Sequence, residues 1–185
     1  MITPCKRNDM HSFVHDQVQN AAYSLLRKEN SNQVFLQIGT KLWYLSSEAL
    51  DKDLFTICHL LYKGLTAVDI DDPDECVRMA HLFMKAGEKT FASNAVRRAA
   101  KYLDTGIKLL CPNCWRNYEL CLQLHNAAVK CALCVSNEEK LNALKNDIFE
   151  NATSILDKVQ SRITQIKYYN ENVRRENAIK LMFAC

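Results

Sequence analysis

The chain has 185 residues, 48% of them hydrophobic and 24% charged, so it can bury a sizeable core and has the composition of an ordinary globular domain. Only four glycines and three prolines are present, which favours long helices over a turn-rich β-sandwich. The 24 basic and 21 acidic residues leave a formal charge of +3, too small and too evenly spread to indicate a nucleic-acid partner.

The sequence predicts neither a secretory signal nor a membrane-spanning segment. The first residues carry charges without the apolar run of a signal peptide, and nowhere do about 18 apolar residues follow one another. We therefore expect a cytoplasmic protein with no membrane partner. Its nine cysteines, an odd number, should remain thiols in that reducing compartment rather than form a disulfide framework.

In the first half of the chain, apolar residues recur at steps of three and four, the spacing of helices that bury one face. Helices are predicted over residues 13–26, 35–45 and 54–65. The polar residues 28–32 should separate the first two. A fourth helix should begin at Pro73, because Asp72 can accept a hydrogen bond from a first-turn amide, and it should end near Gly87, which tolerates a left-handed cap.

The second half of the chain shows the same periodicity. Helices are predicted over residues 92–103, 115–132, 136–149 and 155–166. The seventh helix should open with a capping box at residues 136–139 (SNEE). We expect an N-terminal extension (1–12), a helical repeat domain (13–170) and a helical or frayed tail (171–185), without a strand.

The order of these helices predicts a repeat architecture. Hairpins that recur every 34 to 48 residues, roughly, are typical of tetratricopeptide-type arrays, in which each hairpin buries a face against the next. Trp115, Tyr118 and the small pair Ala86 and Gly87 match parts of that consensus, although the spacing is irregular. We therefore expect an all-α fold of about eight helices, stacked as antiparallel hairpins in a right-handed, tetratricopeptide-like array.

Residues 13–26 (FVHDQVQNAAYSLL) resemble the segment that follows the ATPase module in large multi-sensor histidine kinases and related serine/threonine kinase hybrids. Later segments of the sequence also resemble segments of these proteins, and they occur in the same order. These are residues 36–39 (LQIG), 54–64 (LFTICHLLYKG), 86–89 (AGEK) running into 99–103 (AAKYL), 115–124 and 152–159. The resemblance covers roughly residues 10–170.

In that family, this region is a non-catalytic helical arm between an ATPase of the AAA/STAND type and downstream sensor and kinase domains. The chain departs from the whole family protein, since it has neither a GxxxxGK[ST] phosphate loop nor the kinase Gly-rich and His-Arg-Asp motifs. The resemblance thus implies a signal-transduction scaffold that is not an enzyme. Its partners would be another protein or adjoining ATPase and kinase domains, with self-association through end hairpins. Alternatively, the chain is a fragment of a larger ATPase-kinase without independent function.

Two Cys-x-x-Cys pairs, Cys111 with Cys114 and Cys131 with Cys134, formally satisfy a four-cysteine zinc spacing. The predicted helix opposes a shared site. If residues 115–135 form one helix, Cys114 and Cys131 lie about 25 Å apart, whereas the ligands of one zinc ion converge within about 4 Å. A single site for all four thiols therefore requires a break in that helix.

Cys121 and His125 lie four residues apart on the same predicted helix and could supply two metal ligands, but the sequence identifies no partner for them. Buried thiols often act as small core hydrophobes. The leading expectation is therefore no metal, no cofactor and no catalytic residue. The rival hypothesis is a small metal-binding or redox-sensing protein that uses the cysteines and the histidine between residues 111 and 134. These candidates are Cys111, Cys114, Cys121, His125, Cys131 and Cys134.

Overall fold

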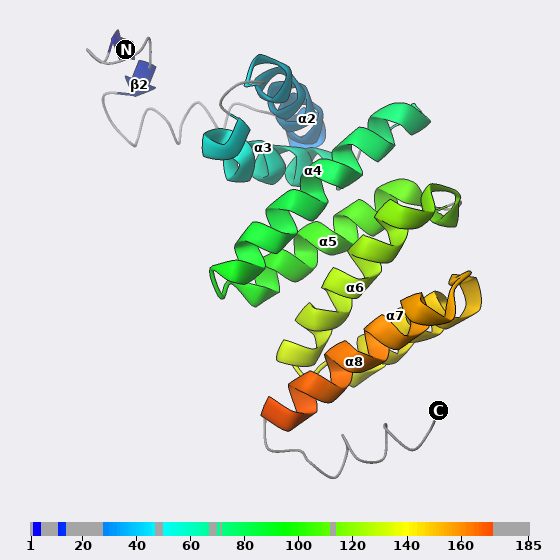
Figure 1. Cartoon of the computed structure of the whole chain (residues 1–185). Coiled ribbons are helices and arrows are strands. Elements are labelled where there is room, and N and C mark those ends of the chain that lie inside the picture. The colour runs from blue at the N-terminus through cyan, green and yellow to red at the C-terminus, as the bar shows by residue number, and fades with distance from the viewer. Residues whose placement is uncertain are drawn as a thin grey trace.

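The computed structural model describes residues 2–4, 11–13, 28–46, 50–66, 70, 72–111 and 114–171. This part of the chain contains seven α-helices and confirms the all-α prediction (Figure 1). They are α2 (Lys28–Leu45), α3 (Leu50–Leu65), α4 (Pro73–Ala92), α5 (Val96–Leu110), α6 (Tyr118–Cys134), α7 (Glu138–Asn151) and α8 (Ile155–Glu171), with a 3-10 turn, η1 (Cys114–Asn117), before α6.

The helices follow one another through the molecule in chain order, from α2 at one end to α7 and α8 at the other (Figure 1). Helices α2 and α3 pack as one hairpin and α4 and α5 as the next, while α6 packs against α5, α7 and α8. Among the described helices, none is long and apolar enough to cross a membrane. The result is a helical array in which most helices contact their neighbours in the sequence.

Two short strands at the N-terminus were not predicted. Strand β1 (Ile2–Pro4) pairs antiparallel with β2 (His11–Phe13), and Ile2 lies opposite Phe13. They occupy the predicted extension, 1–12, and the first residue of the predicted first helix. The rest of that helix, 14–26, lies outside the described residues, as does the predicted tail beyond Glu171.

Helix α2 begins earlier than the sequence analysis predicts. The polar residues 28–32, expected to be a break, form its first turns. Lys and Glu are good helix formers, so the lack of apolar residues there did not mean a lack of helix. By contrast, α4 begins as predicted, at Pro73, and the Asp72 side chain accepts a hydrogen bond from the Asp74 backbone N–H at 3.0 Å.

The predicted end of α4 at Gly87 is wrong. The helix continues to Ala92, and Gly87 is buried within it. A Cβ atom at Gly87 would lie 2.6 Å from Leu103 Cδ2, so glycine here permits the close approach of α4 and α5. The chain turns later, at Asn94, whose φ of 62° is in the left-handed region. Helix α5 consequently starts at Val96 rather than at Ala92.

The start of α7 differs from the prediction by one residue. Asn137, rather than Ser136, caps the helix, because Asn137 Oδ1 accepts a hydrogen bond from the Lys140 backbone N–H at 3.0 Å. Ser136 instead adopts a positive φ of 53° in the turn that ends α6. Ser and Asn are about equally good caps, but the positive φ of Ser136 rules out the extended backbone that an N-cap residue adopts.

Buried side chains form two hydrophobic cores. The N-terminal core comprises Leu54, Ile57, Cys58, Leu61, Met79, Leu82, Phe83, Ala86 and Tyr102 of α3, α4 and α5. The C-terminal core lies among α4, α5, η1, α6 and α7 and includes Leu103, Leu110, Cys114, Cys121, Leu124, Val129, Leu141 and Ile148. The candidate site described next lies in the C-terminal core.

Candidate functional site

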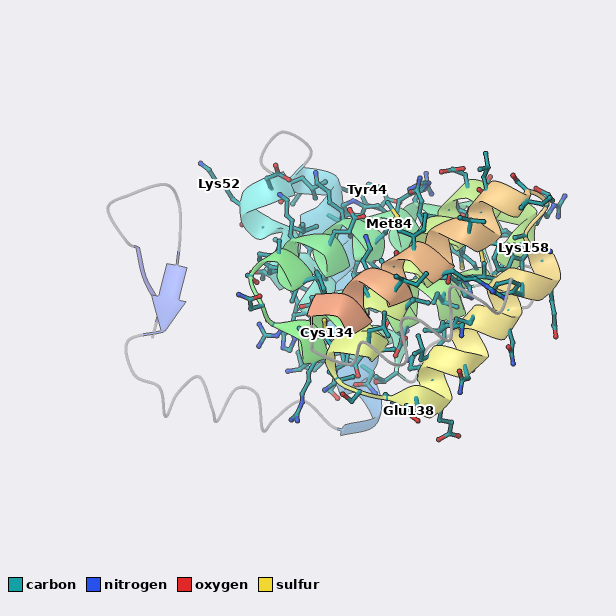
Figure 2. The ribbon with its side chains drawn as sticks, turned by 60° about the horizontal axis from the view of Figure 1, so that its bottom comes forward. Tyr44, Lys52, Met84, Cys134, Glu138 and Lys158 are labelled. Carbon is teal, nitrogen blue, oxygen red and sulfur yellow. The ribbon has the colours of Figure 1, made fainter. Side chains whose placement is uncertain are left out.

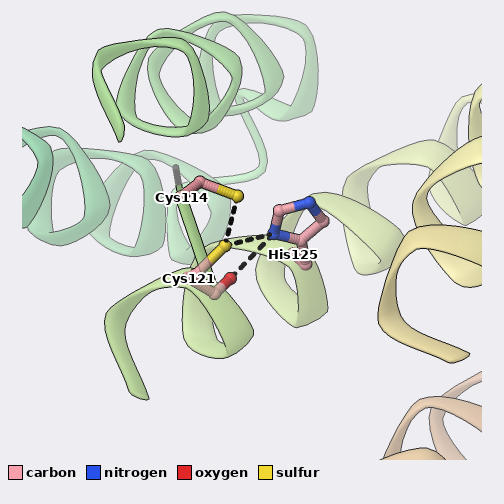
Figure 3. Close-up of side chains that lie close together, drawn as sticks. All are labelled: Cys114, Cys121 and His125. Atoms are coloured by element: carbon pink, nitrogen blue, oxygen red, sulfur yellow. Dashed lines mark hydrogen bonds between the residues drawn. The ribbon is translucent and has the colours of Figure 1, made fainter. Parts of the chain in front are cut away.

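Three side chains that can bind a metal meet at the start of α6. Cys114 comes from η1, and Cys121 and His125 come from the first turns of α6; their side chains point toward one another (Figure 3). One ligand atom from each residue lies within 4.8 Å of the others. The cluster is dry, since the exposed fractions are 5% for Cys114, 0% for Cys121 and 1% for His125.

The 3-10 turn brings Cys114 to the other two residues. In one continuous α-helix, the seven residues from Cys114 to Cys121 would span about 10 Å along the axis. The chain instead leaves helical geometry at Asn117, whose φ of −99° and ψ of 65° precede the first residue of α6. The two Sγ atoms are consequently 2.8 Å apart. The prediction of one helix from Trp115 was therefore wrong in its first residues.

His125 is held on both sides of its ring. His125 follows Cys121 by one helical turn. The His125 Nδ1 atom lies 3.5 Å from Cys121 Sγ and 2.8 Å from the Cys121 carbonyl oxygen. Its Nε2 atom lies 2.7 Å from Asp147 Oδ2, which projects from α7. Both ring nitrogens therefore lie at hydrogen-bonding distance from an acceptor oxygen, a carbonyl on one side and a carboxylate on the other. A metal on Nδ1 would replace the contact with the Cys121 carbonyl oxygen and leave the hydrogen bond from Nε2 to Asp147.

Asp147 is itself held in place by two donors. Trp115 Nε1 donates to Asp147 Oδ1 at 3.1 Å, and Asn151 Nδ2 donates to the same oxygen at 3.0 Å. The Trp115 ring also packs against the His125 ring, with centroids 5.1 Å apart. These contacts connect η1, α6 and α7 through part-buried polar groups at the edge of an otherwise apolar core.

Burial raises the pKa of the Cys114 thiol, and the hydrogen bond with Cys121 only partly opposes this effect. Burial also raises the pKa of Cys121, and the hydrogen bond with Cys114 raises it further. Both side chains are therefore neutral thiols near pH 7 and poor nucleophiles, because the thiolate is the reactive form. A bound cation would reverse that balance by favouring the thiolates.

Cys111 is the next thiol along the chain. It lies directly after α5, is exposed, and contributes to the raised pKa of Cys114 through its charge and a side-chain hydrogen bond. Cys111 also lines a surface pocket of about 540 Å³. It therefore lies close to the cluster, although none of the three cluster residues lines that pocket.

The remaining predicted candidates lie elsewhere. Cys131 is buried, and Cys134 is exposed in the last turn of α6, just before the turn to Glu138 (Figure 2). Cys131 follows His125 by six residues, about 9 Å along the helix axis, and burial raises its pKa to about 12. The two Cys-x-x-Cys pairs thus do not converge on one ion, as the helical argument predicted.

Sequence reasoning paired Cys121 with His125 but missed both of their partners. The seven-residue step from Cys114 to Cys121 is a weak signal, because it brings the thiols together only if the helix is broken between them. Asp147 follows His125 by 22 residues, and no local pattern connects the two. Only the packing of α7 on α6 reveals that contact.

Comparisons with known proteins add no further constraint. No protein-family model matches the chain, and searches of curated proteins and of solved structures found none that is significantly similar. The functional argument therefore depends on the fold, on the site and on the sequence resemblance described above.

Proposed function

We propose that the chain is a non-catalytic interaction module that binds a helical hairpin of a partner protein or adjoining domain. The resemblance of its sequence to the arm of signalling ATPase-kinases supports a scaffold role between an ATPase and downstream sensor and kinase domains. Among the residues that the structure describes, three of the pieces that carry this resemblance fall on successive helices. Residues 54–64 lie in α3, 86–103 span α4 and α5, and 115–124 span η1 and α6. This order is what a continuous arm requires.

The observation that carries the proposal is the apolar surface of α8. Ile155 and Leu156 are 79% and 77% exposed, and Val159 and Ile163, one and two turns after Ile155, are 37% and 40% exposed. In a helical array, such a face is normally covered by the next helical pair. A row of aliphatic side chains at four-residue steps therefore fits a partner helix that packs along α8.

The test is the association state of the purified chain. In the absence of another partner, we expect α8 surfaces of two copies to pair, which sedimentation velocity over a range of concentrations would detect as a reversible monomer–dimer equilibrium. Leu156→Glu should weaken that equilibrium by at least about tenfold, because it removes the burial of one leucine side chain from the interface.

Val135→Glu is the matched control. It introduces the same charge at an exposed aliphatic residue in the turn between α6 and α7, away from the α8 row. Unchanged association in Val135→Glu together with weakened association in Leu156→Glu would support the proposal. A chain that is monomeric at every concentration, or one whose dimer tolerates Leu156→Glu, would contradict it.

A further inference from the structure

We propose that Cys114, Cys121 and His125, completed by Cys111, form a zinc site that fixes the start of α6 to the end of α5. This inference goes beyond the interaction role and depends on different residues. It starts from the donor atoms that the fold already brings together: two sulfurs and one imidazole nitrogen within 4.8 Å in the C-terminal core.

The observed separations are close to those of a tetrahedral zinc centre. With Zn–S bonds of about 2.3 Å and Zn–N bonds of about 2.0 to 2.1 Å, tetrahedral angles place a sulfur and a nitrogen about 3.6 Å apart and two sulfurs about 3.8 Å apart. Cys121 Sγ and His125 Nδ1 are 3.5 Å apart. The Sγ atoms of Cys114 and Cys121 are 2.8 Å apart and need to separate by about 1 Å, within reach of a small side-chain rotation.

Cys111 completes the ligand set. It precedes Cys114 by three residues, the Cys-x-x-Cys spacing of many structural zinc sites. Its thiol is close enough to Cys114 and Cys121 to contribute to the raised pKa of both, and a change of its side-chain rotamer would bring it to the metal. The resulting Cys₃His set has the closed, four-coordinate character of a structural site rather than the open position of a catalytic one.

Asp147 supplies the outer contact that zinc-binding histidines usually have. Its carboxylate lies 2.7 Å from His125 Nε2 and can hold a proton on that nitrogen, while a metal on Nδ1 would replace the present contact between Nδ1 and the Cys121 carbonyl oxygen. Trp115 and Asn151 hold the carboxylate in turn. Asp147 is therefore a positioning residue, and it extends the effect of the metal to α7.

The donor set selects zinc among the common divalent ions. Thiolate and imidazole ligands suit Zn²⁺, whereas Mg²⁺ and Ca²⁺ prefer oxygen ligands. The binding step is balanced by release of protons: each of the three thiols loses one to become a thiolate, and His125 binds the metal through an Nδ1 atom that carries no proton. The ion thereby offsets the cost of burying these thiols as thiolates.

The test is a titration of the reduced full-length chain with Co²⁺, followed by displacement with Zn²⁺. We expect one Co²⁺ per chain, with the intense visible bands of a tetrahedral ion and thiolate-to-cobalt charge-transfer absorption. Cys121→Ser should lower the affinity by more than about tenfold. Cys111→Ser, at an exposed position, should keep the fold while the charge-transfer intensity falls by about one third, because one of three thiolates is lost.

Two further variants sharpen the test. Asp147→Asn should keep the cobalt spectrum but weaken binding by about 10- to 100-fold, the usual cost of losing such an outer contact. Cys131→Ser is the control, since it removes another buried thiol of α6 and should change neither affinity nor spectrum. Failure of the wild-type chain to develop these bands with stoichiometric Co²⁺ would overturn the proposal, and so would a Cys121→Ser or Cys111→Ser spectrum identical to that of the wild type.

Discussion

Each of the two cores contains a fully buried thiol, and the two thiols differ in their surroundings. Cys58 in the N-terminal core is 0% exposed, and its Sγ lies 3.9 Å from the Leu82 carbonyl oxygen. Cys121 in the C-terminal core is equally buried, but its Sγ faces the Cys114 thiol and the His125 ring. Burial alone therefore does not separate a structural thiol from a ligand; the neighbouring donor atoms do.

The same contrast extends to the cores as a whole. The N-terminal core is built from apolar side chains such as Phe83, Leu54 and Ile57. Their burial away from water stabilises it. The C-terminal core adds the polar contacts of His125 and Asp147. We therefore expect changes to the first core to act through packing alone and changes to the second to depend on metal.

The largest effect is expected in the N-terminal core. Phe83→Ala should lower the free energy of unfolding by about 3 to 5 kcal/mol, because it leaves a cavity at a fully buried side chain. Urea unfolding monitored by circular dichroism measures this change. Phe55→Ala, the same substitution at a 41% exposed position of α3, should cost much less. If the effect of Phe83→Ala depended on added zinc, the N-terminal core would also respond to the metal, contrary to the contrast between the two cores.

Zinc should stabilise the C-terminal core next most strongly. A ligand present at 100 times its dissociation constant contributes about 2.7 kcal/mol. Removing zinc with a strong chelator should therefore speed amide hydrogen exchange in α6 and α7 and leave α3 unchanged, which hydrogen-exchange mass spectrometry can resolve by segment. If zinc removal sped amide hydrogen exchange equally in α3 and α6, the two cores would not respond separately to the metal.

A smaller effect is expected between the cores, at the crossing of α4 and α5. Gly87→Ala should cost about 1 to 3 kcal/mol, because the new Cβ would lie 2.6 Å from Leu103 Cδ2 and force Leu103 to move. Thermal unfolding would detect it. Glu88→Ala, at the exposed neighbouring position, should stay within about 0.5 kcal/mol of the wild type. A stabilised Gly87→Ala variant would contradict this account, because it would show that the two helices leave room for a Cβ atom at position 87.

The smallest effect concerns the surface beside the N-terminal core. Lys85 and Lys89 each lie 2.8 Å from Asp51 and lower its pKa from 3.8 to about 2. Since the folded-state pKa is depressed, the contribution to stability is present above about pH 4 and lost as the pH falls toward 2. Asp51→Asn should flatten the pH dependence of unfolding in that window, slightly and only at low salt. An unchanged profile would show that these ion pairs do not contribute.

Local signals in the sequence predicted most of the fold. Asp72 and Pro73 fixed the start of α4 because capping depends on adjacent residues. Gly87 misled the prediction, since a glycine that ends a helix and one that admits a neighbouring helix look the same in sequence. The pairing of Cys121 with His125 followed from their spacing, whereas Asp147 depends on how α7 packs and could not be predicted locally.

Zinc K-edge X-ray absorption on the purified, reduced full-length chain, loaded with one equivalent of Zn²⁺, would show whether the cluster around Cys121 binds the ion. We expect a four-coordinate first shell of three sulfurs at about 2.3 Å and one imidazole nitrogen at about 2.0 to 2.1 Å. A shell of nitrogen and oxygen alone, or a chain that does not retain the zinc, would contradict it and leave Cys121 a structural thiol like Cys58.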